Sequence, residues 1–304
     1  MKVVHKSVLL QEVIDGLNIQ KGDIFVDGTL GNGGHLEEVV KRFGNTAVMI
    51  GIDQDHDAIS RATARLEAYK CPIHYVEGNF RDIQTILKSL NFEKVDKILF
   101  DIGLSSNQFE ESGRGFSFQK DEPLLMTFRK DLKEGDLTAK EILNNWELEN
   151  INTILSSYGE EQFAWKIANA IVERRKIKPI ETTFELVEIV KSATPNFYHH
   201  RKIHPATKTF QALRITVNDE IESLKDGIKN GFELLNYGGR LAVISFHSLE
   251  DRVVKKFFSA KGGSASGGKE GIIITKKPIV PTDEEVKENP RSRSAKLRII
   301  EKQI

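Results

Sequence analysis

The glycine-rich turn at residues 27–35 has the residue types and spacing of a ligand-binding loop. It reads Asp-Gly-Thr-Leu-Gly-Asn-Gly-Gly-His and follows a short apolar run. Glycines have no side chains, so the backbone can turn tightly here and approach a bound molecule closely. Two further carboxylates, Asp53 and Asp101, end two other apolar runs. Because ligands of open α/β sheets bind outside the carboxyl ends of the strands, we expect the turn and both carboxylates to form one site.

The chemistry of this turn leaves more than one interpretation open. A dinucleotide site prefers Gly-x-Gly-x-x-Gly at the start of a helix, where the pyrophosphate lies. Here Asp27 precedes the glycines at positions 31, 33 and 34, and an acid would repel a pyrophosphate. S-adenosylmethionine has no phosphate, and its cationic amine suits an acid beside the turn. The residues therefore favour an S-adenosylmethionine-dependent methyltransferase over a nicotinamide-dependent oxidoreductase. A plain tight turn, with Asp53 as a helix cap, is the third interpretation.

Short apolar runs alternate with helical patterns in the part of the chain that must position this site. We expect strands at residues 23–27, 47–53, 73–76 and 97–101, and helices at residues 36–43, 57–69 and 83–90. Such alternation predicts a parallel sheet that is covered by helices on both faces. Strand patterns return at residues 240–246, 272–275 and 297–300.

Between these two parts, the helical period dominates residues 105–214. Residues 182–185, Thr-Thr-Phe-Glu, have the pattern of a capping box at the start of one helix. We therefore expect an α/β fold in which residues 1–104 and 215–304 form a Rossmann-like, mostly parallel sheet. Residues 105–214 are expected to form an inserted helical domain that recognises the substrate.

Composition excludes several classes of protein. The 304 residues carry 44 basic and 44 acidic side chains, so the chain is no simple polycation, although a local basic face can coexist with an acidic one. No apolar run approaches the ~18 residues of a membrane span, and the N-terminus lacks a signal peptide pattern. The single cysteine, Cys71, excludes an intramolecular disulfide. We expect a cytoplasmic protein with no membrane partner and no metal, since no histidine spacing resembles a metal site. A monomer and a homodimer both remain open.

Beyond the turn, the chain resembles the bacterial ribosomal RNA small-subunit methyltransferase H family over nearly its whole length. The matching stretches are residues 5–10, 27–35, 101–108, 114–118, 158–161, 204–215, 245–252 and 289–294. The longest reads His-Pro-Ala-Thr-Lys-Thr-Phe-Gln-Ala-Leu-Arg-Ile. The resemblance implies a class I S-adenosylmethionine-dependent methyltransferase fold with a helical insertion. It also implies methylation of the N4 amine of a cytidine in the decoding region of 16S rRNA, within the small ribosomal subunit.

The resemblance also implies which residues contact the cofactor S-adenosylmethionine. These are Gly33, Gly34, His35, Asp53, Phe80, Asp101 and Gln108. Phe80 fits this role physically, because an aromatic ring after the third strand can pack against the adenine face. For His35, capping of the helix or contact with the cofactor carboxylate is favoured over a role as ligand or base.

One stretch departs from the family pattern. Where the family usually reads Asp-Gly-Pro-Leu-Asp-Met-Arg-Met, residues 121–128 read Asp-Glu-Pro-Leu-Leu-Met-Thr-Phe. Leu125 and Thr127 therefore stand in place of an acid and an arginine. The departure bears on substrate contact rather than on the cofactor site. It leaves an alternative function open, namely a ribosome-binding assembly factor with weakened or lost methyltransferase activity.

The proposed chemistry assigns two candidate catalytic residues. A cytosine amine is a poor nucleophile, because its lone pair is delocalised into the ring. Hydrogen bonds from the amine to a carboxylate or to backbone carbonyls would localise that lone pair, and much of the catalysis can come from alignment. Asp101 and Ser105, which lie in and after the fourth expected strand, are the candidates. In the alternative interpretation, Asp101 only orders the cofactor.

Charge is uneven within the expected insertion. Residues 105–165 carry 6 basic and 12 acidic side chains, whereas residues 166–214 carry 10 basic and 4 acidic ones. A basic face fits phosphate contacts, and aromatic rings can stack on a flipped base. Candidate RNA contacts are Arg114, Phe116, Phe118, Arg174, Arg175, Arg201, Lys202 and His204. Core packing of at least one phenylalanine and a merely solvated helix face are the alternatives.

Overall fold

The chain forms two compact units in the computed structural model, which describes residues 7–103, 113–129, 132–133, 135–262 and 270–304. Residues 1–103 and 221–304 make up the sheet unit, and residues 104–220 make up the helical unit. The helical unit extends beyond residue 214, because helix α11 (Thr207–Val217) packs against other helices of that unit. None of the helices within the described ranges is long and apolar enough to cross a membrane.

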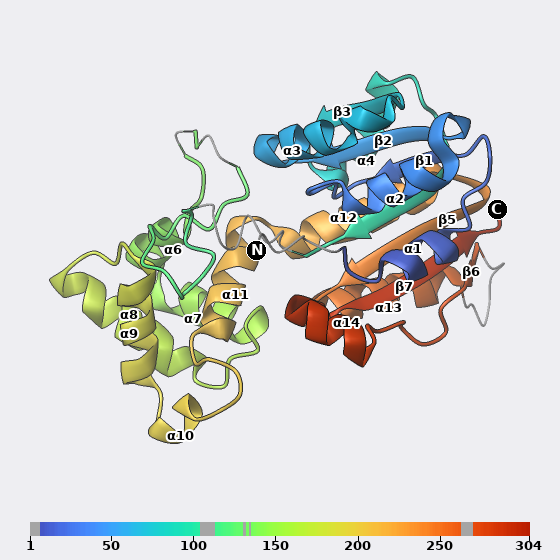
Figure 1. Ribbon diagram of the computed structural model, residues 1–304. Coiled ribbons are helices and arrows are strands. Elements are labelled where there is room, and N and C mark those ends of the chain that lie inside the picture. Colours follow the sequence, from blue (N-terminus) through green and yellow to red (C-terminus); the bar gives the residue numbers. More distant parts are fainter. Residues whose placement is uncertain (1–6, 104–112, 130–131, 134, 263–269) are drawn as a thin grey trace. The chain divides into compact units, whose positions relative to one another are not determined.

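The sheet unit is built on seven strands in the order β3-β2-β1-β4-β5-β7-β6 (Figure 1). The strands are β1 (Ile24–Asp27), β2 (Val48–Asp53), β3 (Ile73–Glu77), β4 (Val95–Asp101), β5 (Leu235–Ser245), β6 (Gly271–Ile273) and β7 (Lys296–Lys302). Strands β1 to β5 pair in parallel, and β7 pairs antiparallel with both β5 and β6. The mostly parallel sheet expected from the sequence is confirmed. The order reverses between β1 and β4, which is where such sheets bind ligands.

Helices cover both faces of this sheet. Neighbouring side chains of each strand point to opposite faces, so the strands contribute apolar side chains to a core on each side. One face packs against α1 (Leu10–Leu17), α2 (Gly34–Phe43) and α3 (His56–Leu66). The other face packs against α4 (Ile83–Ser89), α12 (Glu220–Leu234) and α13 (Ser248–Gly262). Phe25 belongs to the first core and Val26 to the second. Helices α1 and α14 (Asp283–Glu288) were not anticipated from the sequence.

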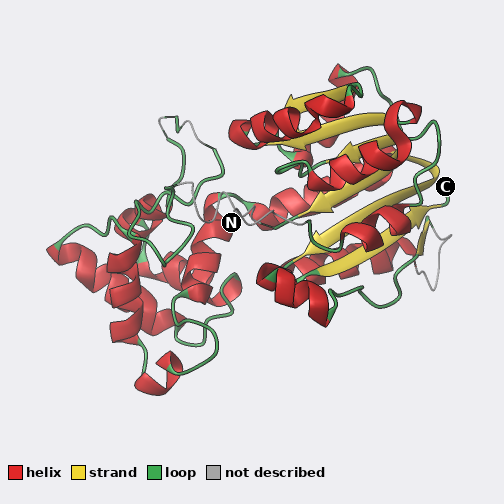
Figure 2. Ribbon diagram, viewed as in Figure 1, coloured by secondary structure: helices red, strands yellow, loops and turns green. Residues whose placement is uncertain are grey.

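The helical unit has a hydrophobic core of its own. Its helices are α6 (Ala139–Asn145), α7 (Leu148–Ser157), α8 (Ala164–Ile177), α9 (Thr183–Ala193), α10 (Asn196–His199) and α11, all red in Figure 2. The expected capping box is present, since Thr182 accepts a hydrogen bond from the Glu185 amide and the Glu185 carboxylate accepts one from the Thr182 amide. The sequence between residues 182 and 185 therefore starts α9 as predicted.

Gly28 lies where the chain leaves β1 and passes close to β4. Its amide donates a hydrogen bond to the carbonyl of Leu99 at 2.9 Å. A Cβ atom at this position would lie 2.6 Å from Cδ1 of Phe100, which is fully buried. Because a buried ring has no free space to move into, only glycine allows the turn this close approach.

We predict that Gly28→Ala destabilises the protein by about 1–3 kcal/mol, because the added methyl overpacks the site against Phe100. Urea unfolding followed by circular dichroism measures the change. The double variant Gly28→Ala/Phe100→Leu, compared with Phe100→Leu alone, is the control. It should cost less than the sum of the two single variants. Strictly additive costs would show that the two side chains do not compete for the same space.

Candidate active site

Three carboxyl groups end three neighbouring strands at one edge of the sheet. Asp27 ends β1, Asp53 ends β2 and Asp101 ends β4, and the strand order places β1 between the other two. These strands are parallel, so their carboxyl ends meet at the same edge. The structure thus brings together the turn and the carboxylates that the sequence singles out.

The glycine-rich turn is hydrogen-bonded to the ends of β2 and β4, the strands on either side of β1. The amide of Gly31 donates to Oδ2 of Asp53 at 2.8 Å, and the amide of Asp101 donates to Oγ1 of Thr29 at 2.6 Å. Gly31 and Gly33 have φ angles of +53° and +74°, in the left-handed region that favours glycine. Backbone conformation and hydrogen bonds therefore fix the turn before any ligand binds.

Asp53 is not a helix cap. The N-cap of α3 is Asp55, whose side chain accepts a hydrogen bond from the Asp57 amide. Asp53 instead accepts hydrogen bonds from the amides of Gly31 and Asp55, at 2.8 and 2.9 Å, and stays half-buried at the strand end. This excludes the interpretation in which Asp53 serves only to start the following helix.

All three carboxyl groups have raised pKa values, chiefly because burial disfavours the ionised form. Burial raises the pKa of Asp27 to about 8, with smaller contributions from the charges of Asp101 and Asp53. Burial raises the pKa of Asp53 to about 6 and that of Asp101 to about 7. Such a cluster at a strand-end edge is typical of a functional site and favours a cationic ligand.

Asp101 has one carboxylate oxygen left without a partner. Its Oδ1 atom is buried and accepts no hydrogen bond from any residue that the structure describes. Its Oδ2 atom lies 3.8 Å from Nδ1 of His35. A buried acceptor without a donor is costly, so this oxygen is the natural place for a ligand N–H or O–H group.

His35 links this cluster to the segment that precedes α1. Its ring is buried, and its Nε2 lies 3.0 Å from the carbonyl oxygen of Val8. Because a carbonyl only accepts hydrogen bonds, Nε2 carries the proton and Nδ1 faces Asp101. The N-cap of α2 is Gly33, so His35 does not cap this helix.

Phe80 starts a short 3₁₀ turn after β3 and packs against the core. Its ring centroid lies 4.9 Å from that of Phe100, and a Cβ atom at Gly227 of α12 would lie 2.6 Å from Cε2 of its ring. The ring is half-buried between β4 and α12. Two further expected site residues, Ser105 and Gln108, lie outside the described residues.

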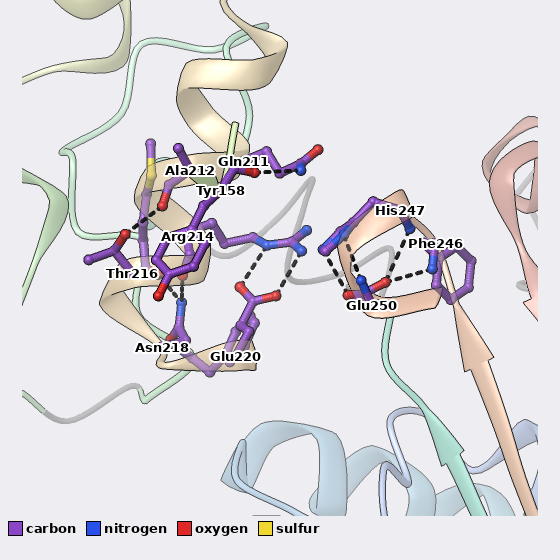
Figure 3. Close-up of polar contacts among 12 residues, drawn as sticks. Tyr158, Gln211, Ala212, Arg214, Thr216, Asn218, Glu220, Phe246, His247 and Glu250 are labelled. Atoms are coloured by element: carbon purple, nitrogen blue, oxygen red, sulfur yellow. Dashed lines mark hydrogen bonds and ion pairs between the residues drawn. The ribbon is translucent and has the colours of Figure 1, made fainter. Parts of the chain in front are cut away.

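Glu250 is a buried carboxylate that the sequence argument did not single out. It accepts hydrogen bonds from the amides of Phe246 and His247 at 2.7 and 3.1 Å and pairs with Nε2 of His247 at 3.0 Å (Figure 3). A Cβ atom at Gly103 would lie 2.6 Å from the Phe246 ring. Glu250 thus fixes the loop after β5, whose Phe246 ring packs against Gly103, two residues after the end of β4. The only signal in the sequence was its place in the family-like stretch 245–252.

The aromatic candidates of the helical unit are largely packing residues. Phe116 is buried and stacks on Phe128 at 5.6 Å between ring centroids. Phe118 stacks on His204 at 4.4 Å. Arg114 donates from Nη1 to the carbonyl of Phe128 at 2.6 Å. For Phe116, the expectation of an exposed stacking ring is replaced by core packing, the alternative that the sequence left open.

The basic candidates divide into two groups. Arg175 donates from Nη1 to the carbonyls of Leu143 and Trp146 at 3.0 and 2.7 Å, so it satisfies the end of α6. Arg174 is half-buried, whereas Arg201 and Lys202 are exposed. Also within this unit, Arg214 forms a two-pronged ion pair with Glu220, with both bonds at 2.8 Å (Figure 3). Sequence alone could not separate these structural arginines from surface ones.

Leu125 and Thr127, the two departures from the family pattern, pack within the helical unit. Thr127 is buried, and its Oγ1 accepts a hydrogen bond from the Arg129 amide at 3.2 Å. Leu125 is half-buried, and its carbonyl accepts one from the Ala139 amide at 3.1 Å. Neither residue belongs to the sheet unit that carries the carboxyl cluster.

A mostly parallel seven-stranded sheet of this order, with a glycine turn after β1 and a carboxylate ending β2, defines the class I S-adenosylmethionine-dependent methyltransferases. Residues 2–303 match the MraW methylase family, and the chain belongs to that family. It is 47% identical to the ribosomal RNA small subunit methyltransferase H of Clostridium botulinum strain Kyoto / Type A2, over 99% of this chain and 100% of the relative. The protein of that name from strain 657 / Type Ba4 matches with the same identity and coverage.

Solved structures resemble this chain more remotely. A rRNA methylase from Streptococcus thermophilus has a TM-score of 0.43 and 11% identity, covering 97% of this chain and 93% of its own. A SAM-dependent O-methyltransferase from Thermotoga maritima has a TM-score of 0.43 and 8% identity, covering 99% and 68%. Family membership therefore rests on the sequence relatives. S-adenosylmethionine is the methyl donor of this class and hence of this chain.

We predict that Asp27→Asn changes how stability depends on pH. The folded protein keeps a proton on Asp27 up to about pH 8, while the unfolded chain loses it near 3.8. This raised pKa therefore adds stability at low pH, which is lost as the pH rises toward 8. Asparagine does not ionise, so the variant lacks this loss. One pKa unit is worth about 1.4 kcal/mol, so the free energy of unfolding of the variant should rise by at least that much relative to wild type between pH 5 and pH 8.

Urea midpoints at several pH values test this prediction, with the exposed Glu93→Gln as the control that should follow wild type. If Asp27→Asn parallels the wild-type curve, then Asp27 is ionised in the folded protein.

Proposed function

We propose that the protein methylates ribosomal RNA, at the N4 amine of a cytidine in the decoding region of 16S rRNA within the small ribosomal subunit, in the cytoplasm. The name of the relatives in Clostridium botulinum supports the RNA substrate. The family-like stretches at residues 204–215 and 245–252 support the particular nucleoside. The observation that carries the chemistry is the buried, unpartnered Oδ1 of Asp101 at the switch point of the sheet.

The residues of this edge fit S-adenosylmethionine and not a dinucleotide. Asp53 lies at the end of β2 with its carboxylate half-buried, where it can accept hydrogen bonds from ribose hydroxyls. Asp27 and Asp101 add two more acidic groups close to the turn, and their charges act on each other. In their ionised forms these acids would repel a pyrophosphate but attract an ammonium and a sulfonium, and such a cation beside them would lower their raised pKa values. This argues against the oxidoreductase interpretation.

Asp101 is the residue proposed to act on the acceptor amine. Bound S-adenosylmethionine supplies an activated methyl group on a sulfonium sulfur. The Oδ1 atom of ionised Asp101 accepts a hydrogen bond from the amine, which localises the nitrogen lone pair. As the nitrogen gains the methyl group it must lose a proton, and Asp101 can take up that proton and release it to solvent. A pKa of about 7 suits this exchange at neutral pH.

The remaining site residues have supporting roles in this proposal. Gly33 and Gly34 let the backbone approach the donor, and His35 holds its ring beside Asp101. Phe80 borders the adenine side, Gln108 keeps the cofactor contact that the resemblance implies, and Ser105 keeps its proposed catalytic role beside Asp101. For RNA, exposed Arg201 and Lys202 are the main phosphate contacts, and half-buried Arg174 is a further candidate. Phe118 and His204, stacked on each other, shape the same unit.

The alternative, an assembly factor without activity, finds no support in the described residues. This alternative was based on Leu125 and Thr127, and both residues fit into the packing of the helical unit. The carboxyl cluster that carries the chemistry is intact in the sheet unit. An enzyme is therefore the function that the site supports best.

The direct test is methyl transfer from tritiated S-adenosylmethionine to small ribosomal subunits that lack the modification. Digestion of the 16S rRNA and chromatography of its nucleosides should reveal N4-methylcytidine. A labelled product at another atom would replace the proposed acceptor, and the absence of any label would favour the assembly factor.

We predict that Asp101→Asn slows single-turnover methyl transfer by about 100-fold or more, because general acid–base roles are typically worth that much. The wild-type rate should rise with pH through about 7, as Asp101 ionises, and this rise should be missing in the variant. Calorimetry with S-adenosylmethionine checks that the donor still binds. The exposed Glu67→Gln is the matched control and should behave as wild type. An unchanged rate would leave Asp101 with only a role in ordering the cofactor.

A further inference from the structure

A group of rings and cations with an exposed outer part lies around helix α10 of the helical unit. Its members are Phe163 and Lys166 at the start of α8, Phe197 and Tyr198 in α10, and Arg201 just after it. We call this group the aromatic platform. It has no part in the carboxyl cluster of the sheet unit, and of its members only Arg201 was singled out by the sequence.

The platform is fixed from beneath by a buried hydrogen bond. The hydroxyl of Tyr198 donates to Oε2 of Glu161 at 2.6 Å, and both residues are buried. Glu161 also accepts a hydrogen bond from the Phe163 amide at 2.9 Å. The rings of Phe163 and Tyr198 meet edge to face at 5.1 Å. Helix α10 is therefore held rigidly against the start of α8.

The outer surface of the platform consists of a ring beside a guanidinium. Phe197 is 60% exposed, and its ring meets that of Phe163 at 6.2 Å. The Cζ atom of Arg201 lies 4.8 Å from the centre of the Tyr198 ring and 5.8 Å from that of Phe197. Lys166 likewise lies over the Phe163 ring at 5.8 Å. A single exposed ring is common on protein surfaces. Here, however, several rings contact one another and two cations lie over them, which indicates a binding surface.

The chain segment that carries α10 and Arg201 has a one-sided charge. Residues 189–218 contain no aspartate or glutamate, but they contain Lys191, Arg201, Lys202, Lys208 and Arg214. Arg201 and Lys202 are exposed, and among the described residues neither forms an ion pair with a carboxylate. Cations that are not neutralised within the protein attract a polyanion.

We propose that the aromatic platform binds single-stranded RNA, with a base stacked on Phe197 and the adjoining phosphates on Arg201 and Lys202. The proposal rests on the proposed function, whose substrate is RNA, and adds where an unpaired stretch of it docks. Proteins that bind single strands combine exposed aromatic rings, on which bases stack, with cations that follow the backbone. Unpaired cations beside an exposed ring fit this chemistry better than an apolar protein partner, which would not need them.

The test uses the full chain and a fluorescein-labelled oligouridylate 12-mer, with binding followed by fluorescence anisotropy. Phe197→Ala should weaken binding by about 5- to 100-fold, the value of one stacked base. Phe197→Trp should keep the wild-type affinity or exceed it. Arg201→Gln should lower the slope of the logarithm of the binding constant against the logarithm of salt concentration by about 1.

Two control variants remove an exposed aromatic ring and an exposed cation elsewhere. Tyr237→Ala removes a ring that is 77% exposed in β5, and Lys88→Gln removes an exposed cation on α4. Both should bind the oligonucleotide as wild type does. Equal affinity of Phe197→Ala and wild type would overturn the proposal. So would a loss of binding to small ribosomal subunits with no loss for naked RNA, since this would identify a protein partner.

The binding assay needs no methyl donor, so it separates the two proposals. A wild-type protein that binds the oligonucleotide through Phe197 but transfers no methyl group to small ribosomal subunits would refute the proposed function and support the platform as an RNA-binding surface. A protein that methylates the RNA, but whose Phe197→Ala variant binds as wild type does, would refute the platform alone.

Discussion

The burial of three carboxyl groups at the carboxyl ends of neighbouring strands is the constraint on which the rest of the sheet unit depends. Burial disfavours the ionised form of each carboxyl group and is the main reason why the pKa values of Asp27, Asp53 and Asp101 all rise, with a smaller contribution from nearby acidic charges. Amides of the turn offset part of this cost, because Gly31 donates to Asp53 and Thr29 to Asp27. The amides of the glycine turn therefore stabilise the buried carboxyl groups, in addition to leaving room for a ligand.

Several family-like stretches of the helical unit serve packing within that unit. Gly159 lies between the end of α7 and α11, where a Cβ atom would be 2.8 Å from the carbonyl oxygen of Lys208. Gln211 donates to the carbonyl of Tyr158 at 2.9 Å (Figure 3). The stretches at residues 158–161 and 204–215 thus fit each other. The two stretches contact each other in the folded unit. Glu161 of the first stretch also accepts a hydrogen bond from the hydroxyl of Tyr198 in α10.

The sequence predicted what depends on local pattern and chain order. Apolar runs located the strands, parallel order brought Asp53 and Asp101 to one edge, and the capping box at Thr182 started a helix. What it could not predict depends on which way a side chain points after packing. Arg175 and Arg201 look alike in sequence, yet one satisfies carbonyls of α6 and the other lies on the surface. Glu250 was missed because its partners are amides, which carry no sequence signal.

The acidic edge around Asp27 also bears on the steps that follow methyl transfer. The donor arrives with a positive sulfonium, whereas the spent cofactor has a neutral sulfur. The ionised carboxyl groups of this edge therefore attract the donor more strongly than the product that remains, and the reaction itself removes part of the attraction. On the proposed assignment of the site, the same carboxyl groups that attract the charged donor hold the neutral product less strongly, which favours its release after each reaction.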